Sequence, residues 1–152
     1  MKNRLYTYLA GWIFLWLPAL LLAQTINSPT AFFLMHSSGN HVAKDAQGGA
    51  VLEAADAPSP QKLTFIPDGN GYYALQSDDG QGYLSLSGQW NTSFTTDPSS
   101  AKALYAIENS GKFFIKLRCK YNNKYLGTDG TTASSAVYSD KDGTDTRHPV
   151  SY

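Results

Sequence analysis

The sequence of 152 residues contains a single cysteine, Cys119. One cysteine excludes an internal disulfide, so the folded chain must be stabilised by packing. No histidine or expected helix start lies near Cys119 to activate its thiol. We therefore expect a partly buried strand residue at this position and no reactive thiol.

The chain also lacks an excess of either charge. Its 12 Lys and Arg residues balance its 12 Asp and Glu residues. Nucleic acids and anionic lipids are bound by concentrations of basic residues, which this composition does not indicate. We expect no nucleic-acid partner, and no membrane partner once the amino-terminal segment has been removed.

Groups for catalysis are few. The three histidines, His36, His41 and His148, have no evident nucleophile beside them in the sequence. The carboxylates at 78–79 and 140–145 lie in turn segments, where Asp commonly bonds its own backbone. The second of these segments does not match the ligand spacing of a calcium loop. We expect no catalytic site, no cofactor and no metal site in this chain.

The first 23 residues have the pattern of a signal peptide. Lys2 and Arg4 precede an apolar run of about fourteen residues, and Ala23 ends the segment with the small residue that signal peptidase accepts. The run is shorter than the roughly 20 residues of a membrane-spanning helix. We expect cleavage before Gln24, a short linker over 24–30, and export to the periplasm, cell surface or medium. The mature chain would carry 10 basic and 12 acidic residues, a net charge of −2.

The rest of the chain has little helical periodicity and many strand-like runs. Aromatic, β-branched and alternating apolar residues recur in short segments. These segments are AFFLMH, KLTFIP, GYYALQS, GYLSLS, ALYAIE, KFFIKLR and SAVYS. Clusters rich in Gly, Asn and Asp separate them and favour tight turns. The pattern predicts an all-β sandwich or barrel.

One short sequence motif recurs three times, as SGNHVAKD, GQGYLSLS and NNKYLGTD. It places Val42, Leu84 and Leu126 at intervals of 42 residues. Four further markers recur in the same order in each repeat. Two are aromatic: a doubled aromatic at Phe33, Tyr73 and Phe114, and a ring side chain at His41, Tyr83 and Tyr125. Two are charged: an acid that ends the third strand, at Asp56, Asp97 and Asp140, and a base that enters the fourth strand, at Lys62, Lys102 and Arg147.

Three repeats of about 40 residues with four strands each predict a β-trefoil of about twelve short strands. One repeat cannot bury its apolar face alone, whereas three repeats around an axis share one core. A propeller of similar period needs at least four blades. We therefore predict one trefoil domain over 31–152, with repeats at approximately 31–70, 71–111 and 112–152. The motif residues Val42, Leu84 and Leu126 should occupy equivalent core positions.

The third repeat also carries a resemblance. KFFIKLRCK, NNKYLGTD and SSAVYSDKDGTD resemble the fascin-like and ricin-B-like trefoil modules, and more narrowly the amino-terminal trefoil modules of secreted bacterial glycoside hydrolases. The likeness covers nearly all of 31–148. It implies a non-catalytic accessory domain that binds glycan, with a catalytic domain covalently linked to it.

Two features depart from this family pattern. The Gln-x-Trp signature of ricin-type lectins is absent, because Gln89 directly precedes Trp90. Related modules close with His followed by aromatic residues, whereas this chain has Pro149 and Val150 after His148. Because Pro149 has no N–H for a strand ladder, the last strand should be frayed or confined to an edge.

Sugar binding requires flat aromatic rings beside polar side chains, because a pyranose presents C–H groups on one face and hydroxyls around its rim. The loop GQWNTS supplies such a group, and we expect its tryptophan to be exposed as a stacking platform. The candidates of the second repeat are Gln89, Trp90, Asn91 and Asp97, and those of the third are Tyr121, Asn122, Asn123, Asp129 and Tyr138. Packing is the competing role for Tyr138, as it is for Tyr83 and Tyr125.

These patterns lead to one functional prediction and one alternative. The prediction is an exported, non-catalytic carbohydrate-binding module that acts on a glycan or polysaccharide. The alternative is a trefoil that binds a protein partner through an exposed loop, as protease inhibitors and cytoskeletal scaffolds do. A glycan array beside a protease-inhibition panel separates the two.

Overall fold

The structure is a computed structural model that describes residues 26–109, 115–142 and 150–151. The predicted signal peptide and residues 24–25 of the predicted linker lie outside this part of the chain, whereas linker residues 26–30 lie within it and β1 begins at Thr30. The described strands are β1 (Thr30–Leu34), β2 (His41–Lys44), β3 (Ala50–Glu53), β4 (Leu63–Pro67), β5 (Tyr73–Ser77), β6 (Tyr83–Leu86), β7 (Thr92–Thr95), β8 (Leu104–Asn109), β9 (Ile115–Cys119), β10 (Tyr125–Thr128), β11 (Val137–Lys141) and β12 (Val150–Ser151). A short 3-10 helix, η1 (Ala101–Ala103), precedes β8.

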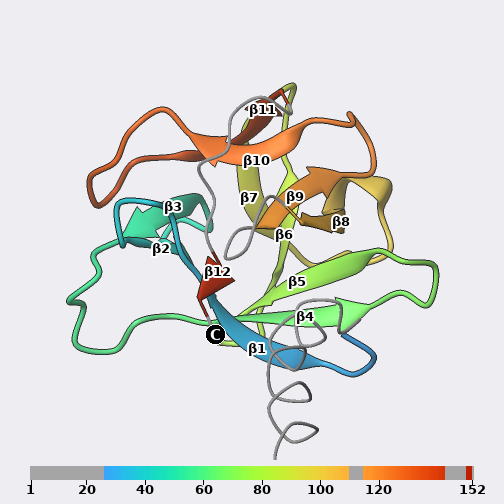
Figure 1. Cartoon of the computed structure of the whole chain (residues 1–152), viewed down its shortest axis with the longest axis horizontal. Coiled ribbons are helices and arrows are strands. Elements are labelled where there is room, and N and C mark those ends of the chain that lie inside the picture. Colours follow the sequence, from blue (N-terminus) through green and yellow to red (C-terminus); the bar gives the residue numbers. More distant parts are fainter. Residues whose placement is uncertain (1–25, 110–114, 143–149, 152) are drawn as a thin grey trace, which may run out of the picture.

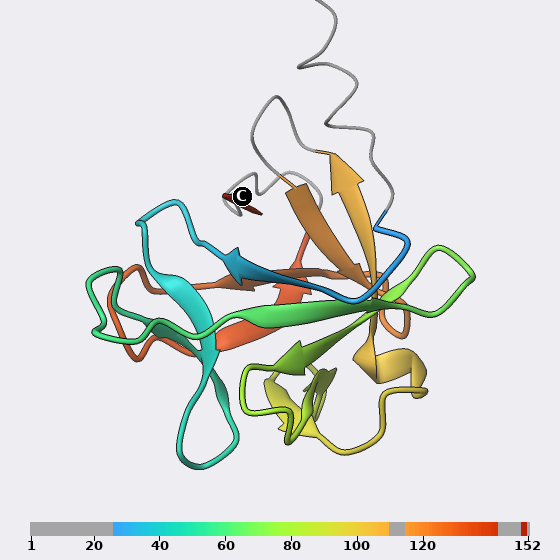
Figure 2. The same cartoon turned by 90° about the horizontal axis from the view of Figure 1, so that it is seen from below.

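The strands form a β-trefoil (Figure 1). Antiparallel neighbours run in the order β12, β1, β4, β5, β8 and β9, which are the barrel strands. Three hairpins, β2–β3, β6–β7 and β10–β11, extend from them. Figure 2 shows the same barrel and hairpins from below. The predicted all-β trefoil class is confirmed, and β12 pairs only with β1 among the described strands, as expected for an edge strand.

The same turn joins barrel to hairpin in all three lobes. At each turn, a residue at the end of the barrel strand donates its N–H across the loop and accepts a backbone bond at its carbonyl. His36, Ser77 and Cys119 are these residues, with N–H to carbonyl distances of 2.8, 2.8 and 2.9 Å to Asn40, Gly82 and Lys124. Their spacing in the sequence is 41 and 42 residues. The repeat of the sequence is therefore a repeat of hydrogen-bonded turns.

The three hairpins are closed into a ring by a second set of backbone bonds. The N–H groups of Leu52, Phe94 and Ser139 donate to the carbonyl oxygens of Ser135, Gly48 and Trp90 at 2.8, 2.7 and 2.8 Å. Each bond joins one hairpin to another, so every lobe donates once and accepts once. The ring places Gly48, Trp90 and Ser135 in equivalent positions. Gly48 has a φ of 83°, a conformation that costs glycine little.

The three motif residues lie in the core, as predicted. Val42, Leu84 and Leu126 are all buried, and Leu84 is 0% exposed. Barrel residues meet them from three lobes, including Leu34, Leu75 and Leu117. The residues with aromatic side chains that begin each hairpin are also equivalent. His41, Tyr83 and Tyr125 pair with Met35, Gln76 and Arg118, respectively.

Two of the other markers are out of register. The turn spacing aligns Tyr73 with Phe32, so Phe33 is displaced by one residue. Asp56 and Asp97 follow the ends of β3 and β7, whereas Asp140 lies within β11. The hairpins differ in loop length, which loops tolerate, so the acid of the third lobe falls within a strand. The paired aromatics Phe32–Phe33 and Tyr72–Tyr73 let two adjacent alignments look alike in the sequence. Phe114 and Arg147 lie outside the described residues.

The lone Cys119 is more deeply buried than expected. Its side chain is 0% exposed at the end of β9, where it packs with the core. Its thiol lies 3.8 and 3.9 Å from the carbonyl oxygens of Lys102 and Ala101. Strand alternation explains this position, because Leu117 is also buried and the residues between and beside them face outward.

Candidate functional site

The β6–β7 turn presents the predicted tryptophan to solvent. The N–H of Ser87 donates to the carbonyl oxygen of Asn91 at 2.9 Å, and the hydroxyl of Ser87 donates to the same oxygen at 3.3 Å. These bonds close the turn, while the Trp90 carbonyl is used in the hairpin ring. The Trp90 side chain remains 41% exposed. The backbone of this residue is thus fixed and its indole is presented outward.

Contacts with Ser139 bring the two predicted clusters together. The N–H of Ser139 donates to Trp90, and the carbonyl oxygen of Ser139 accepts a bond from the Asn122 side-chain amide at 2.7 Å. Asn122 follows Tyr121, which is 59% exposed. The β6–β7 turn of the second lobe and the β9–β10 turn of the third therefore meet at one residue of β11. We call the surface of Gln89, Trp90, Asn91, Tyr121 and Tyr138 the aromatic surface.

Polar groups on the aromatic surface are free to bind a ligand. Gln89 and Asn91 are exposed and Tyr138 is half-buried. Asn91 and Tyr138 form a bridge between their backbones. Within the described residues, no hydrogen bond engages the side chains of Gln89, Asn91 or Tyr138. Two amides and one phenol therefore keep their donors and acceptors beside two exposed rings.

The other four candidates are engaged in internal contacts. Asp97 accepts from the backbone and hydroxyl of Ser99 at 2.9 and 2.7 Å. Asn122 is held by Ser139, Asn123 accepts from Arg118 at 3.0 Å, and Asp129 pairs with Lys141. Asn123 also adopts a φ of 57°, which suits a turn residue. These side chains shape the loops, and the structure does not bring Asp97 into contact with Trp90.

The ionisation of Asp97 follows from its turn. The hydroxyl and then the backbone N–H of Ser99 donate to this carboxylate and lower its pKa. Hydrogen bonds to the charged form stabilise that form. Asp97 is therefore a capped, ionised turn residue, whereas the sequence analysis placed it among the sugar-binding candidates.

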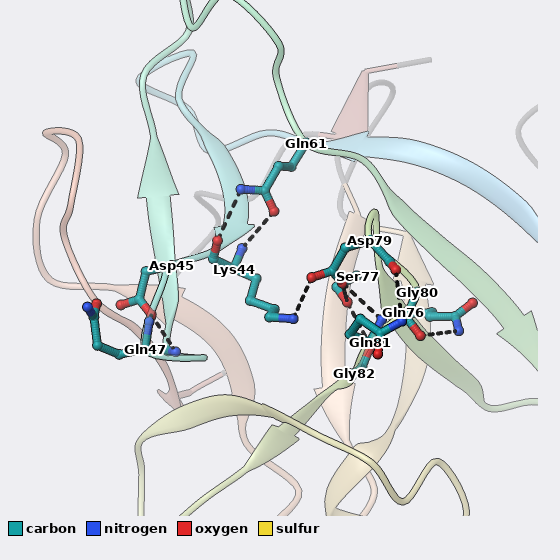
Figure 3. Close-up of polar contacts among 11 residues, drawn as sticks. Lys44, Asp45, Gln47, Gln61, Gln76, Ser77, Asp79, Gly80, Gln81 and Gly82 are labelled. Atoms are coloured by element: carbon teal, nitrogen blue, oxygen red, sulfur yellow. Dashed lines mark hydrogen bonds and ion pairs between the residues drawn. The ribbon is translucent and has the colours of Figure 1, made fainter.

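A polar cluster between the first and second lobes was missed by the sequence analysis (Figure 3). The ammonium of Lys44 on β2 lies 2.6 Å from a carboxylate oxygen of Asp79 in the β5–β6 turn. Asp79 also accepts from the hydroxyl of Ser77 at 2.6 Å and the N–H of Gln81 at 2.9 Å. The hydrogen bond from Lys44, followed by that from Ser77, holds the pKa of Asp79 far below its usual range. No local pattern could reveal this pair, because 35 residues separate its members.

Gln61 completes the same cluster by binding the backbone of Lys44. Its side-chain oxygen accepts from the Lys44 N–H at 3.2 Å, and its amide donates to the Lys44 carbonyl at 3.0 Å. Its own N–H donates to Glu53 at 2.8 Å. Figure 3 shows Gln61 and Asp79 approaching Lys44 from different sides. Because its groups bind one another, we assign this cluster to the joint between lobes.

A second charged network lies on the outer face of β8, β9 and β10. Arg118 donates to Glu108 at 2.5 Å, and the Tyr125 hydroxyl donates to the other oxygen of that carboxylate at 2.7 Å. The bonds from Arg118 and then Tyr125 lower the pKa of Glu108. The bond to Glu108 raises the pKa values of Arg118 and Tyr125. Tyr125 thus has a structural role, as the packing alternative predicted.

A small apolar hollow, with a cavity volume of about 10 Å³, lies elsewhere in the described part of the chain. Its walls include the core residues Leu34, Val42, Leu52, Leu117 and Leu126. No residue of the aromatic surface lines it. We therefore assign the hollow to the packing of the barrel.

Two classes of site are unsupported in the described part of the chain. Its His, Cys, Asp and Glu residues form no group of three suited to a metal ion. None of its helices is long and apolar enough to cross a membrane.

Comparisons with known proteins establish the fold at low sequence identity. No protein-family model and no curated protein matches this chain. A designed threefold-symmetric protein, ThreeFoil, aligns over 80% of this chain and 98% of its own, with 14% identity and a TM-score of 0.70. A GH43 β-1,3-galactosidase aligns over 81% of this chain and 27% of its own, with 17% identity and a TM-score of 0.65.

A lectin is also among the similar structures. The Polyporus squamosus lectin, solved with the epitope Neu5Acα2-6Galβ1-4GlcNAc, aligns over 84% of this chain and 49% of its own. The identity is 11% and the TM-score 0.64. This chain thus spans about half of the lectin chain and about a quarter of the galactosidase chain. At these identities the likeness shows a shared β-trefoil fold.

Proposed function

We propose that this chain is an exported, non-catalytic carbohydrate-binding domain whose platform is Trp90. The indole stacks on a sugar ring, and the free groups of Gln89, Asn91 and Tyr138 bind the hydroxyls at its rim. Tyr121 provides a second exposed ring in the turn that Asn122 ties to Ser139. This arrangement combines flat apolar faces with amphipathic hydrogen-bonding groups, which is the chemistry of sugar recognition.

The observation that carries the proposal is the symmetry of the hairpin ring. Trp90 occupies the position held by Gly48 in the first lobe and Ser135 in the third. The ring of hairpins uses the carbonyl group of each residue. Gly48 has a positive φ that favours glycine, whereas Trp90 and Ser135 do not, so the backbone bond makes no demand on the side chain in the second and third lobes. An exposed indole at a position where hydrogen or a hydroxymethyl group suffices has a role other than packing.

Structural neighbours support the same class of ligand. One is a lectin solved with a sialylated trisaccharide and another is a galactosidase of which the aligned part forms about a quarter. We extend the proposal to an accessory role, in which this domain holds a glycoside hydrolase near its polysaccharide. Export would place the domain where such substrates occur, and mass spectrometry of exported protein should find a mature start near Gln24.

The proposal is tested by glycan-array and polysaccharide-retention measurements on wild type and Trp90→Ser. Single-site affinity should be weak, on the order of 10 µM to 1 mM, because a shallow site competes with water for the sugar hydroxyls. Trp90→Ser should remove about 1 to 3 kcal/mol of binding free energy. Trp90→Tyr is the matched control, since it keeps an aromatic platform and should keep most of the affinity.

Two results would count against this role. A Trp90→Ser variant that binds every glycan as tightly as wild type would remove Trp90 from the site. A wild-type protein that binds no glycan but inhibits a protease in a parallel panel would favour the protein-interaction alternative instead.

A further inference from the structure

Basic residues are concentrated in one part of a chain whose total charge is balanced. Residues 98–128 contain six Lys and Arg residues and a single acidic residue, Glu108. The remainder of the chain contains the other six basic residues and eleven acidic residues. The segment covers η1, β8, β9 and β10. Charge is therefore segregated onto the side of the trefoil that also carries Tyr121.

Strand alternation places three of these cations on one face. Leu117 and Cys119 of β9 are buried, so Lys116, Arg118 and Lys120 point outward. Alternate residues of a strand are about 6.6 to 6.8 Å apart along its axis. A row of positive charges thus runs along β9 toward the β9–β10 turn.

Aromatic rings position the lysine ammonium groups of this region. The Nζ of Lys120 lies 4.5 Å from the ring centroid of Tyr72, and the Nζ of Lys102 lies 5.0 Å from that of Tyr121. Cation–π contacts of this kind orient an ammonium without neutralising its charge. No carboxylate of the described residues forms an ion pair with Lys102 or Lys120. Their charges are therefore available to an external anion.

The carboxylates nearest to this row are already engaged. Glu108 binds Arg118 and Tyr125. Asp68 lies in the turn before Tyr72, where it accepts from the backbone N–H groups of Asn70 and Tyr72 at 2.7 and 3.0 Å. The backbone bonds from Asn70 and then Tyr72 lower the pKa of the Asp68 carboxyl, and Lys120 is close enough for its charge to contribute to this shift. Neither Lys102 nor Lys120 forms an ion pair within the described residues, so both ammonium groups can still contact an external anion.

We infer that the ligand is an acidic polysaccharide, whose carboxylate or sulfate groups bind Lys102 and Lys120 while a sugar ring stacks on Trp90. The inference rests on the proposed glycan-binding role, because Tyr121 belongs to both surfaces. Asn122 ties that turn to Ser139, which also binds the Trp90 backbone. A chain lying across this part of the third lobe therefore meets the rings and then the cations.

The density of the cations favours such a polysaccharide over nucleic acid. Duplex DNA carries one negative charge per ~1.7 Å of its axis. The β9 row offers one positive charge per ~6.7 Å, with Glu108 beside its centre. Single-stranded nucleic acids also stack several successive bases on aromatic platforms, whereas the large exposed rings among the described residues are Trp90 and Tyr121 alone. A polymer with one anionic group per one or two sugar rings matches the sparser row.

The test compares wild type, a Lys102→Gln/Lys120→Gln double variant and Trp90→Ser against four immobilised probes. The probes are polygalacturonate, chondroitin sulfate, a neutral galactan and a duplex DNA. Wild type should bind one of the two acidic polysaccharides more tightly than the galactan. The double variant should bind that probe about 5 to 30 times more weakly at 50 mM salt, because exposed charge pairs contribute up to about 1 kcal/mol each. This difference should shrink at 300 mM salt through screening.

Lys62→Gln is the matched control. Lys62 is exposed, has no ion pair within the described residues, and lies 5.0 Å from the centroid of the Phe33 ring in the first lobe. Its loss removes the same charge and the same kind of contact away from the surface, so affinity should change less than about twofold. The two acidic probes separate carboxylate recognition from sulfate recognition.

The outcomes distinguish this inference from the proposal beneath it. If galactan binds at least as well as the acidic probes and the lysine changes have no effect, the inference is wrong while the glycan proposal stands. If no polysaccharide binds, both are wrong. Equal or tighter binding of duplex DNA overturns the inference, because the surface would then select charge alone.

Discussion

The N–H of Ser139 donates to the carbonyl oxygen of Trp90 at 2.8 Å, joining the third hairpin to the second. The same serine accepts the Asn122 amide through its own carbonyl. One residue of β11 therefore fixes two loops that are about 30 residues apart in the sequence. This double contact holds the turn that carries Trp90 and the turn that carries Tyr121 beside the same residue.

Removal of the indole should leave the fold intact. Because the equivalent positions hold Gly48 and Ser135, Trp90→Ser keeps the backbone hydrogen bond from Ser139 and loses only an exposed side chain. The free energy of unfolding should stay within about 0.5 kcal/mol of wild type. Urea unfolding measures this change. A loss of about 3 kcal/mol or more would indicate a buried packing role.

Truncation of the core motif residue Leu84 should lower the free energy of unfolding. Leu84 is fully buried at the base of the second hairpin, so Leu84→Ala leaves a cavity in the shared core. The expected loss is about 2 to 5 kcal/mol of unfolding free energy, out of a typical total of about 5 to 15 kcal/mol. Thermal and urea unfolding would test it, with Trp90→Ser as the exposed comparison. A neutral Leu84→Ala variant would contradict the assigned core.

The thiol of Cys119 should report on unfolding. It is free and fully buried against the carbonyl groups of η1. A thiol reagent should therefore label it slowly in buffer and rapidly in denaturant, because reaction requires an opening of the core. Labelling rates followed by absorbance or mass spectrometry give the result. Rapid labelling of the native protein would show that β9 is accessible.

Glu108 should make stability depend on pH. The hydrogen bonds from Arg118 and then Tyr125 lower its folded-state pKa below the ordinary value of 4.5. A lowered folded pKa gives stability that is present above the unfolded pKa and is lost as the pH falls through the folded pKa. Urea midpoints at pH 6 and pH 3 should therefore differ less in Glu108→Gln than in wild type. An unchanged difference would mean that this carboxylate does not contribute.

The three repeats were predictable because they depend on local sequence patterns. The spacing of Val42, Leu84 and Leu126 reflects core positions that admit few residue types, and strand alternation places their neighbours outside. Turn residues such as Gly39 and Gly80 mark where each hairpin begins. The markers that failed are the aspartates, of which Asp56 and Asp97 follow strands while Asp140 lies within β11, and the doubled aromatics, which lie in barrel strands but one residue out of register.

The candidate site was predictable only in part. A large aromatic residue in a polar loop indicated that Trp90 would be exposed, and the structure agrees. The roles of Asp97, Asn123 and Asp129 could not be separated from ligand binding in the sequence, because turn capping and sugar binding use the same side chains. The partners of these residues became visible only with the fold.

The sequence alone determined the fold class, the threefold repeat and three equivalent core residues, Val42, Leu84 and Leu126, because alternation and turn chemistry act over a few neighbouring residues. The tertiary structure decided which exposed side chains share a surface. The turns of Trp90 and Tyr121, which meet at Ser139, and the side chains of Lys44 and Asp79 are brought together by the closing of three lobes around one axis. Such contacts depend on the relative placement of whole hairpins, and no local pattern encodes that placement.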